Sequence, residues 1–427
     1  MPFPAALRAL RGRNYRLFIS GQLVSLIGTW MQTVAQAWLV YRLTGSAAML
    51  GLIGFAGQIP VFVLAPLGGV IADRVNRHRV LVITQTTMML LALTLAALTL
   101  TDVVRVWQIF VLASLLGVAN SFDIPARQSF IAQMVGREDL VNAIALNSSM
   151  VNGARMVGPA VAGIVVAEVG EGWCFLLNGL SYVAVITALL RMRVAAIASP
   201  TATVSAWVSV VEGFSFAWRT TPVRALLLLL GLVSLMGMPY SVLMPIFADR
   251  ILGGGPHAYG LLMSCSGVGA LLGAASLTSR RSVRGLGRWV ASSAVGFGVA
   301  LIAFSFSRSL WLSAMVLVPA GFCMMVEMAS SNTLIQSMVP DRLRGRVMAV
   351  YSMMFMGMAP LGALMAGALA QPLGAPVTVA MGGVACIVGG LTFGSRLPAL
   401  RGPARELIVA QQMAAGGPPD EATRLTS

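Results

Sequence analysis

Long apolar runs alternate with short polar segments along the chain. Twelve runs have the length, about 20 residues, that a helix needs to cross a hydrocarbon layer of about 30 Å. They lie at 17–41, 48–71, 80–101, 104–124, 141–167, 172–190, 224–247, 257–279, 289–307, 309–333, 347–370 and 375–395. The pattern predicts an all-α polytopic membrane protein. Because twelve is an even number, both termini are expected on the same side of the membrane.

Composition agrees with the pattern of runs. Hydrophobic residues make up 57% of the 427 residues, charged residues 10%, and the mean hydropathy is +0.84. Soluble domains carry about 25% charged residues. The composition therefore excludes an ordinary soluble protein.

The basic net charge of +15 follows the predicted topology. All 29 basic residues are arginine. Arg42, Arg105, Arg250 and Arg308 fall on one side of the membrane, Arg155 lies within a span, and the others lie on the side of the termini. Positive loops face the cytoplasm. We therefore expect cytoplasmic termini, a location in the plasma membrane (bacterial inner membrane), and no nucleic-acid partner.

The sequence lacks the residues that several classes of reaction require. Without lysine there is no Walker A loop and no Schiff base. The four cysteines lie in apolar runs without a CxxC pair, and His78 and His257 are the only histidines. We expect no metal, no cofactor and no enzyme activity, since no clustered catalytic set is visible. An integral-membrane enzyme is the less favoured alternative.

The spans divide into two halves of six. The predicted parts are an N-terminal six-helix half (1–191), a cytoplasmic linker with an amphipathic surface helix (192–223), a C-terminal half (224–395) and a disordered cytoplasmic tail (396–427). With a shift of 204 residues, Asp123 aligns with Glu327 and Gly158 with Gly362. The two halves are therefore predicted to be a duplicated, pseudo-symmetric pair, as in many secondary transporters.

The loop after the second span carries a recognisable motif. It reads Gly68-Gly-Val-Ile-Ala-Asp73-Arg74-Val-Asn76-Arg77-His-Arg79. The motif resembles the signature of the major facilitator superfamily between helices two and three, with Asn76 in place of the usual glycine. The segments 120–128 and 339–347 resemble its enterobactin-exporter and macrolide-efflux branch, and residues 153–163 are similar to the motif of drug:proton antiporters. The resemblance covers about residues 8–396.

The resemblance implies a secondary active transporter. Its expected activity is proton-coupled export of a small amphiphilic compound, a drug-like molecule or a siderophore, by alternating access. Expected partners are that substrate, protons and membrane lipids, with the chain as a monomer. A lipid or lysolipid translocator and an importer of the same fold remain alternatives.

The first span has a polar face. It consists of Gln22, Ser25, Thr29, Gln32 and Gln36, at steps of three and four. Polar side chains in lipid must face protein or water. This face is predicted to line the substrate cavity; hydrogen bonding between helices is the alternative.

The fifth span carries a second polar face around a cation. Ser148, Asn152 and Arg155 lie at steps of four and three. A charge at mid-helix costs roughly 2.5 to 3.5 kcal/mol on insertion scales. Arg155 is therefore predicted to bind an anionic substrate group or to help move protons, and a structural partnership is the alternative.

Asp123 and Glu327 are the acids within predicted spans. A proton-coupled exporter needs a carboxyl group that can gain and lose a proton. Glu327 is the first candidate and Asp123 the second, with a fixed salt bridge as the alternative for each.

A cytoplasmic gate is expected from the motif residues and their neighbours. An acid there can stabilise a helix N-terminus, although most arginines are also explained as a positive flank. The predicted gate residues are Gly69, Asp73, Arg74, Arg77, Arg127, Asp341 and Arg346.

Overall fold

The fold is helical, as the sequence predicts. The structure, a computed structural model, describes residues 5–135, 138–192, 206–278 and 283–414. Within these ranges every regular element is a helix, and twelve segments are long and apolar enough to cross a membrane. The prediction of an all-α protein with twelve membrane spans is confirmed.

The helices follow the predicted runs with longer ends. A 3-10 helix, η1 (Ala5–Arg11), precedes the first span. The first six spans are α1 (Arg13–Thr44), α2 (Ala47–Arg74), α3 (Arg77–Leu100), α4 (Val106–Met134), α5 (Leu140–Val169) and α6 (Glu171–Leu190). The short helix α7 (Ala206–Arg219) then occupies the part of the linker where an amphipathic helix is predicted.

Two of the remaining spans are interrupted by π-helical turns. The seventh span comprises α8 (Thr221–Leu232), η2 (Val233–Gly237), α9 (Tyr240–Ile246) and η3 (Phe247–Ile251), and the eleventh comprises α13 (Asp341–Ser352), η4 (Met353–Gly357) and α14 (Met358–Leu373). The others are α10 (Gly255–Thr278), α11 (Leu286–Phe306), α12 (Leu310–Met338) and α15 (Ala375–Ala414). Such π turns leave carbonyl groups without their usual helical partners. The hydroxyl of Ser234 in η2 donates to the carbonyl of Phe355 in η4 at 2.5 Å, which joins the two interrupted spans.

The chain folds as two compact units. The first unit contains Met1–Thr203 and Val242–Gly267, and the second contains Val204–Ser241 and Val268–Ser427. The segment Val242–Gly267 belongs to the first unit because it packs on α1 and α5. The Tyr41 hydroxyl donates to Asp249 Oδ2 at 2.7 Å, and the backbones of Gly163 and Gly260 approach closely.

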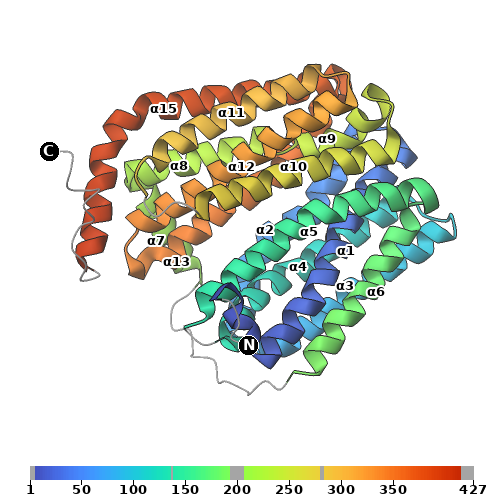
Figure 1. The fold of residues 1–427 in the computed structure, drawn as a ribbon, viewed down its shortest axis with the longest axis horizontal. Helices are drawn as coiled ribbons and strands as arrows, with labels where there is room; N and C mark the ends of the chain where they lie inside the picture. The colour runs from blue at the N-terminus through green and yellow to red at the C-terminus, as the bar shows by residue number, and fades with distance from the viewer. Residues whose placement is uncertain (1–4, 136–137, 193–205, 279–282, 415–427) are drawn as a thin grey trace. The chain divides into compact units, whose positions relative to one another are not determined.

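Each unit buries its own core. In the first, α1 packs against α5 and α6, α2 against α4, and α3 against α4 and α6 (Figure 1). Phe18 and Phe130 meet edge to face there, with ring centroids 6.2 Å apart. In the second, α11 packs against α12 and α15.

The predicted duplication is visible in the backbone. Gly170 and Gly374, 204 residues apart, both adopt positive φ, +92° and +84°, in the turns before α6 and α15. Gly158 lets α5 approach the α1 backbone at Ile27, and Gly362 lets α14 approach the backbone at Leu235. Small residues permit such close crossings. Each unit therefore repeats the same turn and the same helix crossing.

Asn76 has a local role that explains its place in the motif. Its side-chain oxygen accepts hydrogen bonds from the backbone N–H groups of His78 at 3.0 Å and Arg79 at 3.4 Å. Asparagine is a strong N-cap residue. It therefore starts α3 where the motif usually has glycine.

The C-terminal segment differs from the prediction. Residues 396–414 are helical, as the end of α15, rather than disordered; residues 415–427 lie outside the described residues, as does 193–205 of the linker. Pro398 and Pro403 lie inside this helix, which changes direction towards its C-terminus (Figure 1). Leu397, Leu400 and Ile408 are buried. Their burial stabilises a helix in a segment whose lack of apolar periodicity led to the prediction of disorder.

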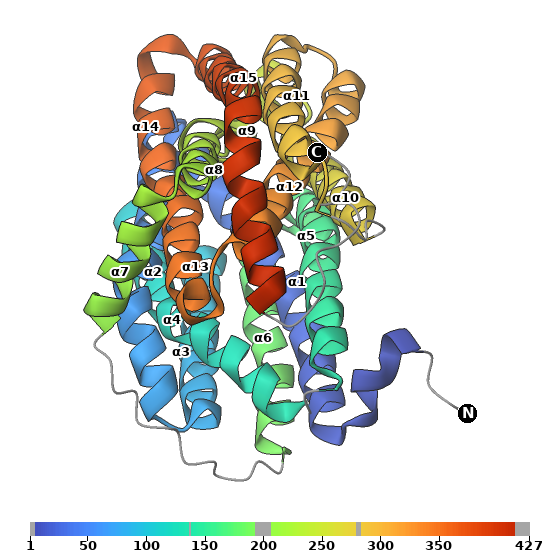
Figure 2. The same ribbon diagram turned by 90° about the vertical axis from the view of Figure 1, so that its left-hand side faces the viewer.

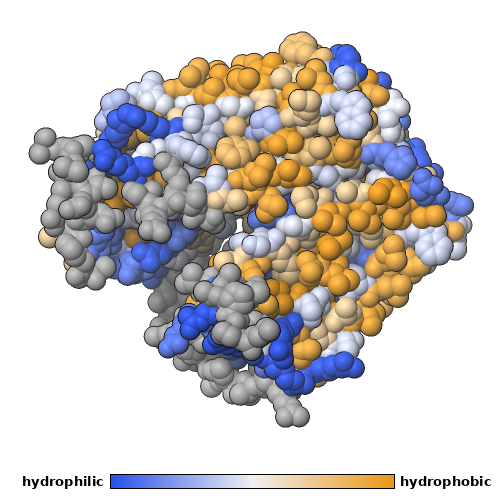
Figure 3. Space-filling model, in the orientation of Figure 1, coloured by the Kyte–Doolittle hydropathy of each residue, from blue (hydrophilic) through white to orange (hydrophobic). Residues whose placement is uncertain are grey.

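The surface carries the apolar side chains that a lipid solvent requires. Phe306, Trp311 and Met315 are each 72% exposed. Figure 3 shows hydrophobic side chains along the sides of the helices on the visible face. A water-soluble protein rarely exposes so much contiguous apolar surface.

The crossing at Gly158 gives a test of the packing. In Gly158→Ala the new Cβ would lie 2.5 Å from Trp30 Cβ and 2.9 Å from the Ile27 carbonyl oxygen, so α1 and α5 must separate. Overpacking costs about 1–3 kcal/mol. We expect a lower thermal unfolding midpoint for the purified protein in detergent. In the control Gly153→Ala, on the same helix, the Cβ meets nothing within 4 Å. Equal midpoints for the two variants would contradict the crossing.

Candidate functional site

The polar face of α1 is directed into the first unit. Gln22, Ser25 and Gln32 are buried, and Thr29 and Gln36 are half-buried. The Asn178 amide of α6 donates to Gln32 Oε1 at 2.6 Å, and Thr29 lies 3.5 Å from the Tyr182 hydroxyl. These contacts are the hydrogen bonds between helices that the sequence left as the alternative. Contact of this face with a substrate stays a prediction.

Asp123 lies at the centre of a polar network. It is 1% exposed, and its Oδ1 accepts from Thr84 Oγ1 and from Gln85 Nε2, each at 2.9 Å. Arg127 Nε lies 3.4 Å from its Oδ2, and Arg127 Nη1 donates to Gln22 Oε1 at 3.4 Å. The network joins α1, α3 and α4. It gives the Asp123 carboxylate a cation and two neutral donors, which compensate its burial.

Glu327 has very different surroundings in the second unit. It is 1% exposed, and its Oε1 accepts a hydrogen bond from Ser331 Oγ at 3.4 Å. The side chains of Tyr351 and Cys386 lie close enough to the Glu327 carboxyl group to interact with its charge. In the described part of the chain no cation forms an ion pair with it.

The internal repeat places Asp123 and Glu327 at related positions in the two halves. With the same shift of 204 residues, Arg127 aligns with Ser331. Both lie four residues after their acid and both contact it, one through a cation and one through a hydroxyl. The two halves thus hold a compensated carboxylate and a carboxyl group without a cation at related positions.

Arg155 is half-buried on α5 and lies over an aromatic ring. Its guanidinium carbon is 5.5 Å from the centre of the Trp30 ring of α1, a cation–π geometry. Asn152 is half-buried and donates to the Ser148 carbonyl at 2.9 Å, and Ser148 is exposed. The predicted polar face of α5 therefore runs from an exposed end to a cation held against α1.

The predicted gate residues fall in both units. In the first, Gly69 is half-buried with open space beside it, and Arg77 begins α3. The side chains of Asp73 and Arg74 lie outside the described residues. Arg127 pairs with Asp123, four residues before it on α4.

In the second unit the gate residues make local pairs. Asp341 Oδ1 lies 2.5 Å from Arg344 Nη2 on α13. Arg346 forms an ion pair with Glu212 of α7, and Gly213 lies against the Arg346 backbone. Figure 2 shows α7 beside α13. The linker helix is thus fastened to the start of the eleventh span.

Sequence analysis missed several partners of these residues. Trp30, Asn178, Tyr182 and Glu212 lie in different segments from the residues they contact. Only Glu212 has a signal in the sequence, as the one acid within the apolar and aromatic stretch 207–218. The rest are polar or aromatic residues in apolar runs, and only the fold identifies their neighbours.

Metal chemistry finds no support in the arrangement of side chains. Among the described residues no group of three or more His, Cys, Asp or Glu side chains could hold a metal ion. The four cysteines are free thiols. The polar side chains described above are carboxyl, amide, hydroxyl and guanidinium groups.

Known proteins are similar to this chain in sequence. The profile of a family described as transmembrane secretion effector matches residues 5–415. Three relatives cover most of this chain and of their own length. They are the staphyloferrin A transporter of Staphylococcus aureus (24% identity; 88% of this chain, 95% of the relative), the multidrug efflux pump Tap of Mycolicibacterium fortuitum (28%; 85% and 90%) and the enterobactin exporter EntS of Salmonella typhi (23%; 88% and 90%).

Solved structures show the same fold at low identity. The nucleoside transporter NupG is similar with a TM-score of 0.70 at 14% identity, over 90% of this chain and 98% of that one. A POT family transporter in complex with 5-aminolevulinic acid has a TM-score of 0.72 at 12% identity, over 91% and 97%. The chain is therefore a multi-pass membrane protein that belongs to the transmembrane secretion effector family of the major facilitator superfamily of transporters.

Proposed function

We propose that the chain exports a small amphiphilic compound, a drug-like molecule or a siderophore, in exchange for protons by alternating access. The observation that carries the proposal is Glu327. A carboxylate buried at mid-span with one hydroxyl contact is costly in its charged form. Binding a proton removes that cost, and hydration or a cation restores the charge. This is the behaviour that proton coupling requires.

Asp123 supports the proposal by contrast. Arg127, Thr84 and Gln85 all contact its carboxylate and compensate its burial. We assign Asp123 a structural role that holds α1, α3 and α4 together. Glu327 remains the first candidate for the coupling site.

The first unit offers the groups that could bind an anionic substrate. Arg155 lies over Trp30, with Asn152 one turn before it on α5. An arginine beside an aromatic ring binds carboxylates and catecholates through charge-assisted hydrogen bonds and stacking. Two of the relatives are named for siderophores and one for drugs. An amphiphilic substrate with an anionic or polar group fits this chemistry.

The proposed orientation places both termini in the cytoplasm. The arginine asymmetry of the loops supports it. Pairs such as Arg346 with Glu212 would then lie at the cytoplasmic ends of the spans, where a gate must open and close.

Efflux from cells tests the function directly. Cells that express the chain are loaded with lipophilic dyes, macrolides or catecholate siderophores, and efflux is followed with and without a protonophore. We expect protonophore-sensitive export of at least one class. Export that a protonophore leaves unchanged would contradict proton coupling, and inward movement or movement of lipid alone would contradict the proposed direction or substrate.

Glu327→Gln tests the coupling site. The amide keeps the size and the hydrogen bond of Glu327 but cannot lose a proton, so we expect efflux to fall to the level that remains with a protonophore and to become insensitive to external pH. The control is Glu168→Gln, since the Glu168 side chain is 70% exposed and lies 3.7 Å from His257. Parent-like, pH-dependent efflux by Glu327→Gln would exclude Glu327 as the coupling site.

Arg155→Gln tests anion recognition. A charge-assisted hydrogen bond contributes about 1.5–3 kcal/mol, which corresponds to about tenfold or more in affinity. We expect at least that loss in the export of an anionic siderophore and a smaller effect on a neutral dye. Arg105→Gln, at an exposed arginine, is the control. Equal losses for both substrates would show that Arg155 stabilises the helices rather than selecting the anion.

A further inference from the structure

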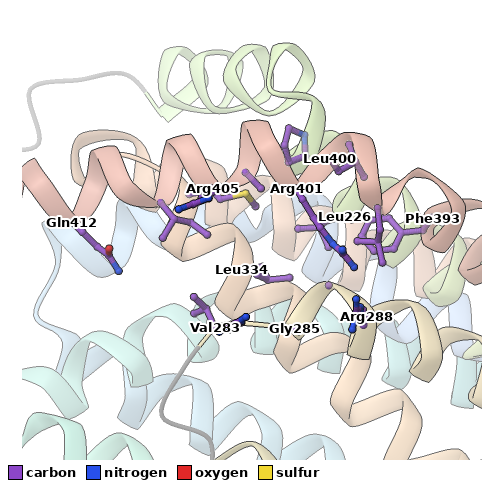
Figure 4. A pocket seen from close by; sticks show the side chains of 17 residues that line it. Leu226, Val283, Gly285, Arg288, Leu334, Phe393, Leu400, Arg401, Arg405 and Gln412 are labelled. Carbon is purple, nitrogen blue, oxygen red and sulfur yellow. The ribbon is translucent and has the colours of Figure 1, made fainter. Parts of the chain in front are cut away.

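The second unit contains a cavity that none of the candidate site residues lines. Its volume is about 430 Å³. It lies between the segment leading into α11, the end of α12 and the last turns of α15, which face it from opposite sides (Figure 4). The cavity exists because α15 continues past Pro398 and Pro403 instead of ending at the membrane span.

The floor of the cavity is apolar. Leu226 of α8, Leu334 and Met338 of α12, and Phe393 and Leu397 of α15 line it and are all buried. These side chains belong to membrane-spanning helices. The floor is therefore formed by helices that are long and apolar enough to cross a membrane.

The rim of the cavity is strongly basic. Arg284 and Arg288 line it from the α11 side, and Arg401 and Arg405 line it from α15. Arg401 and Arg405 are four residues apart on α15 and so lie on one face of that helix. Arg284 lies in the turn before α11, and Arg288 lies in the first turn of α11. Figure 4 shows Arg288 and Arg401 reaching towards the cavity from opposite sides. No acidic residue lines the cavity in the described part of the chain.

An apolar floor and a basic rim together fit a ligand that has an anionic group and an apolar part. Guanidinium groups on two sides of one cavity can bind the same anion from both sides. Arginine binds phosphate with two parallel hydrogen bonds. Basic pockets between membrane helices on the cytoplasmic side bind the headgroups of anionic lipids. A soluble phosphate compound would satisfy the arginines but would leave the apolar floor without a partner.

We propose that this cavity binds an anionic diacyl phospholipid, such as phosphatidylglycerol or cardiolipin. The phosphate lies between Arg288 and Arg401, and the acyl chains cover the apolar floor on α12 and α15. The bound lipid would hold the end of α15 against the start of α11. The site is separate from Glu327 and Arg155 and does not depend on which substrate the chain exports.

Binding is measured on the purified full chain in a neutral detergent. Native mass spectrometry gives the number of retained lipids, and the thermal unfolding midpoint is recorded against lipid concentration. We expect phosphatidylglycerol to bind saturably and to raise the midpoint, and phosphatidylcholine to do so at least about tenfold more weakly, a difference of about 1.4 kcal/mol.

Two variants test the site itself. Arg288→Gln with Arg401→Gln removes one arginine from each side, and we expect phosphatidylglycerol to bind at least tenfold more weakly. The matched control is Arg191→Gln with Arg396→Gln, which removes the same charge from exposed arginines, one of them on α15, that do not line the cavity. Ala404→Trp fills the cavity without changing charge and is expected to block binding. If the double variant does not fold, the Ala404→Trp variant still tests whether the lipid binds in this cavity.

Three outcomes would overturn the proposal. Equal loss of binding in the double variant and its control would show that net charge alone attracts the lipid. Parent-like binding by Ala404→Trp would place the lipid elsewhere. Displacement of the lipid by glycerol 3-phosphate at equal concentration would show a site for soluble phosphate esters. Lipid binding that the two cavity variants alone reduce, and that glycerol 3-phosphate does not compete for, supports the proposal.

Discussion

The structure depends on one constraint: the hydrocarbon layer offers no hydrogen-bond partners. Every polar group within it must find its partner inside the protein. The backbone meets this requirement as helices, and the polar side chains meet it as small networks. The Gln32–Asn178 pair and the Asp123 network are two such networks, each joining helices that are distant in sequence. Polar contacts therefore join helices of the first unit in addition to its apolar core.

The same constraint makes the sparse hydrogen bonding of Glu327 significant. Asp123 has a cation and two donors, whereas Glu327, its counterpart in the second half, has one hydroxyl. Duplication produces two related carboxyl positions, and the change between Arg127 and Ser331 makes them different. One position is suited to holding helices together. We propose that the other exchanges a proton, because no cation among the described residues pairs with it.

The arginines of this chain serve more than topology. Most are explained by the preference of basic residues for one side of the membrane. Arg155 lies against Trp30 within a span, Arg346 ties α13 to α7, and Arg288 and Arg401 face one cavity. For Arg155 and Arg346 the guanidinium group adds stacking or directed hydrogen bonding to its charge. Lysine would supply the charge without that geometry.

The sequence by itself determined the membrane class, the twelve spans and the repeat, because about 20 apolar residues in a row have one stable arrangement in lipid and because aligned glycines mark equivalent turns. It also identified Asp123, Glu327 and Arg155, since a charge inside a span is rare. It could not separate their roles: Thr84, Gln85 and Trp30 are distant in sequence, and only the packing of α1, α3, α4 and α5 brings them together. The helical end of α15 was decided in the same way, because burial of Leu400 and Ile408 outweighed a local composition that predicts disorder. The hydrophobic periodicity of a helix indicates which solvent its exposed face contacts. The partner of a buried polar group, in contrast, is determined only by how the helices pack against each other.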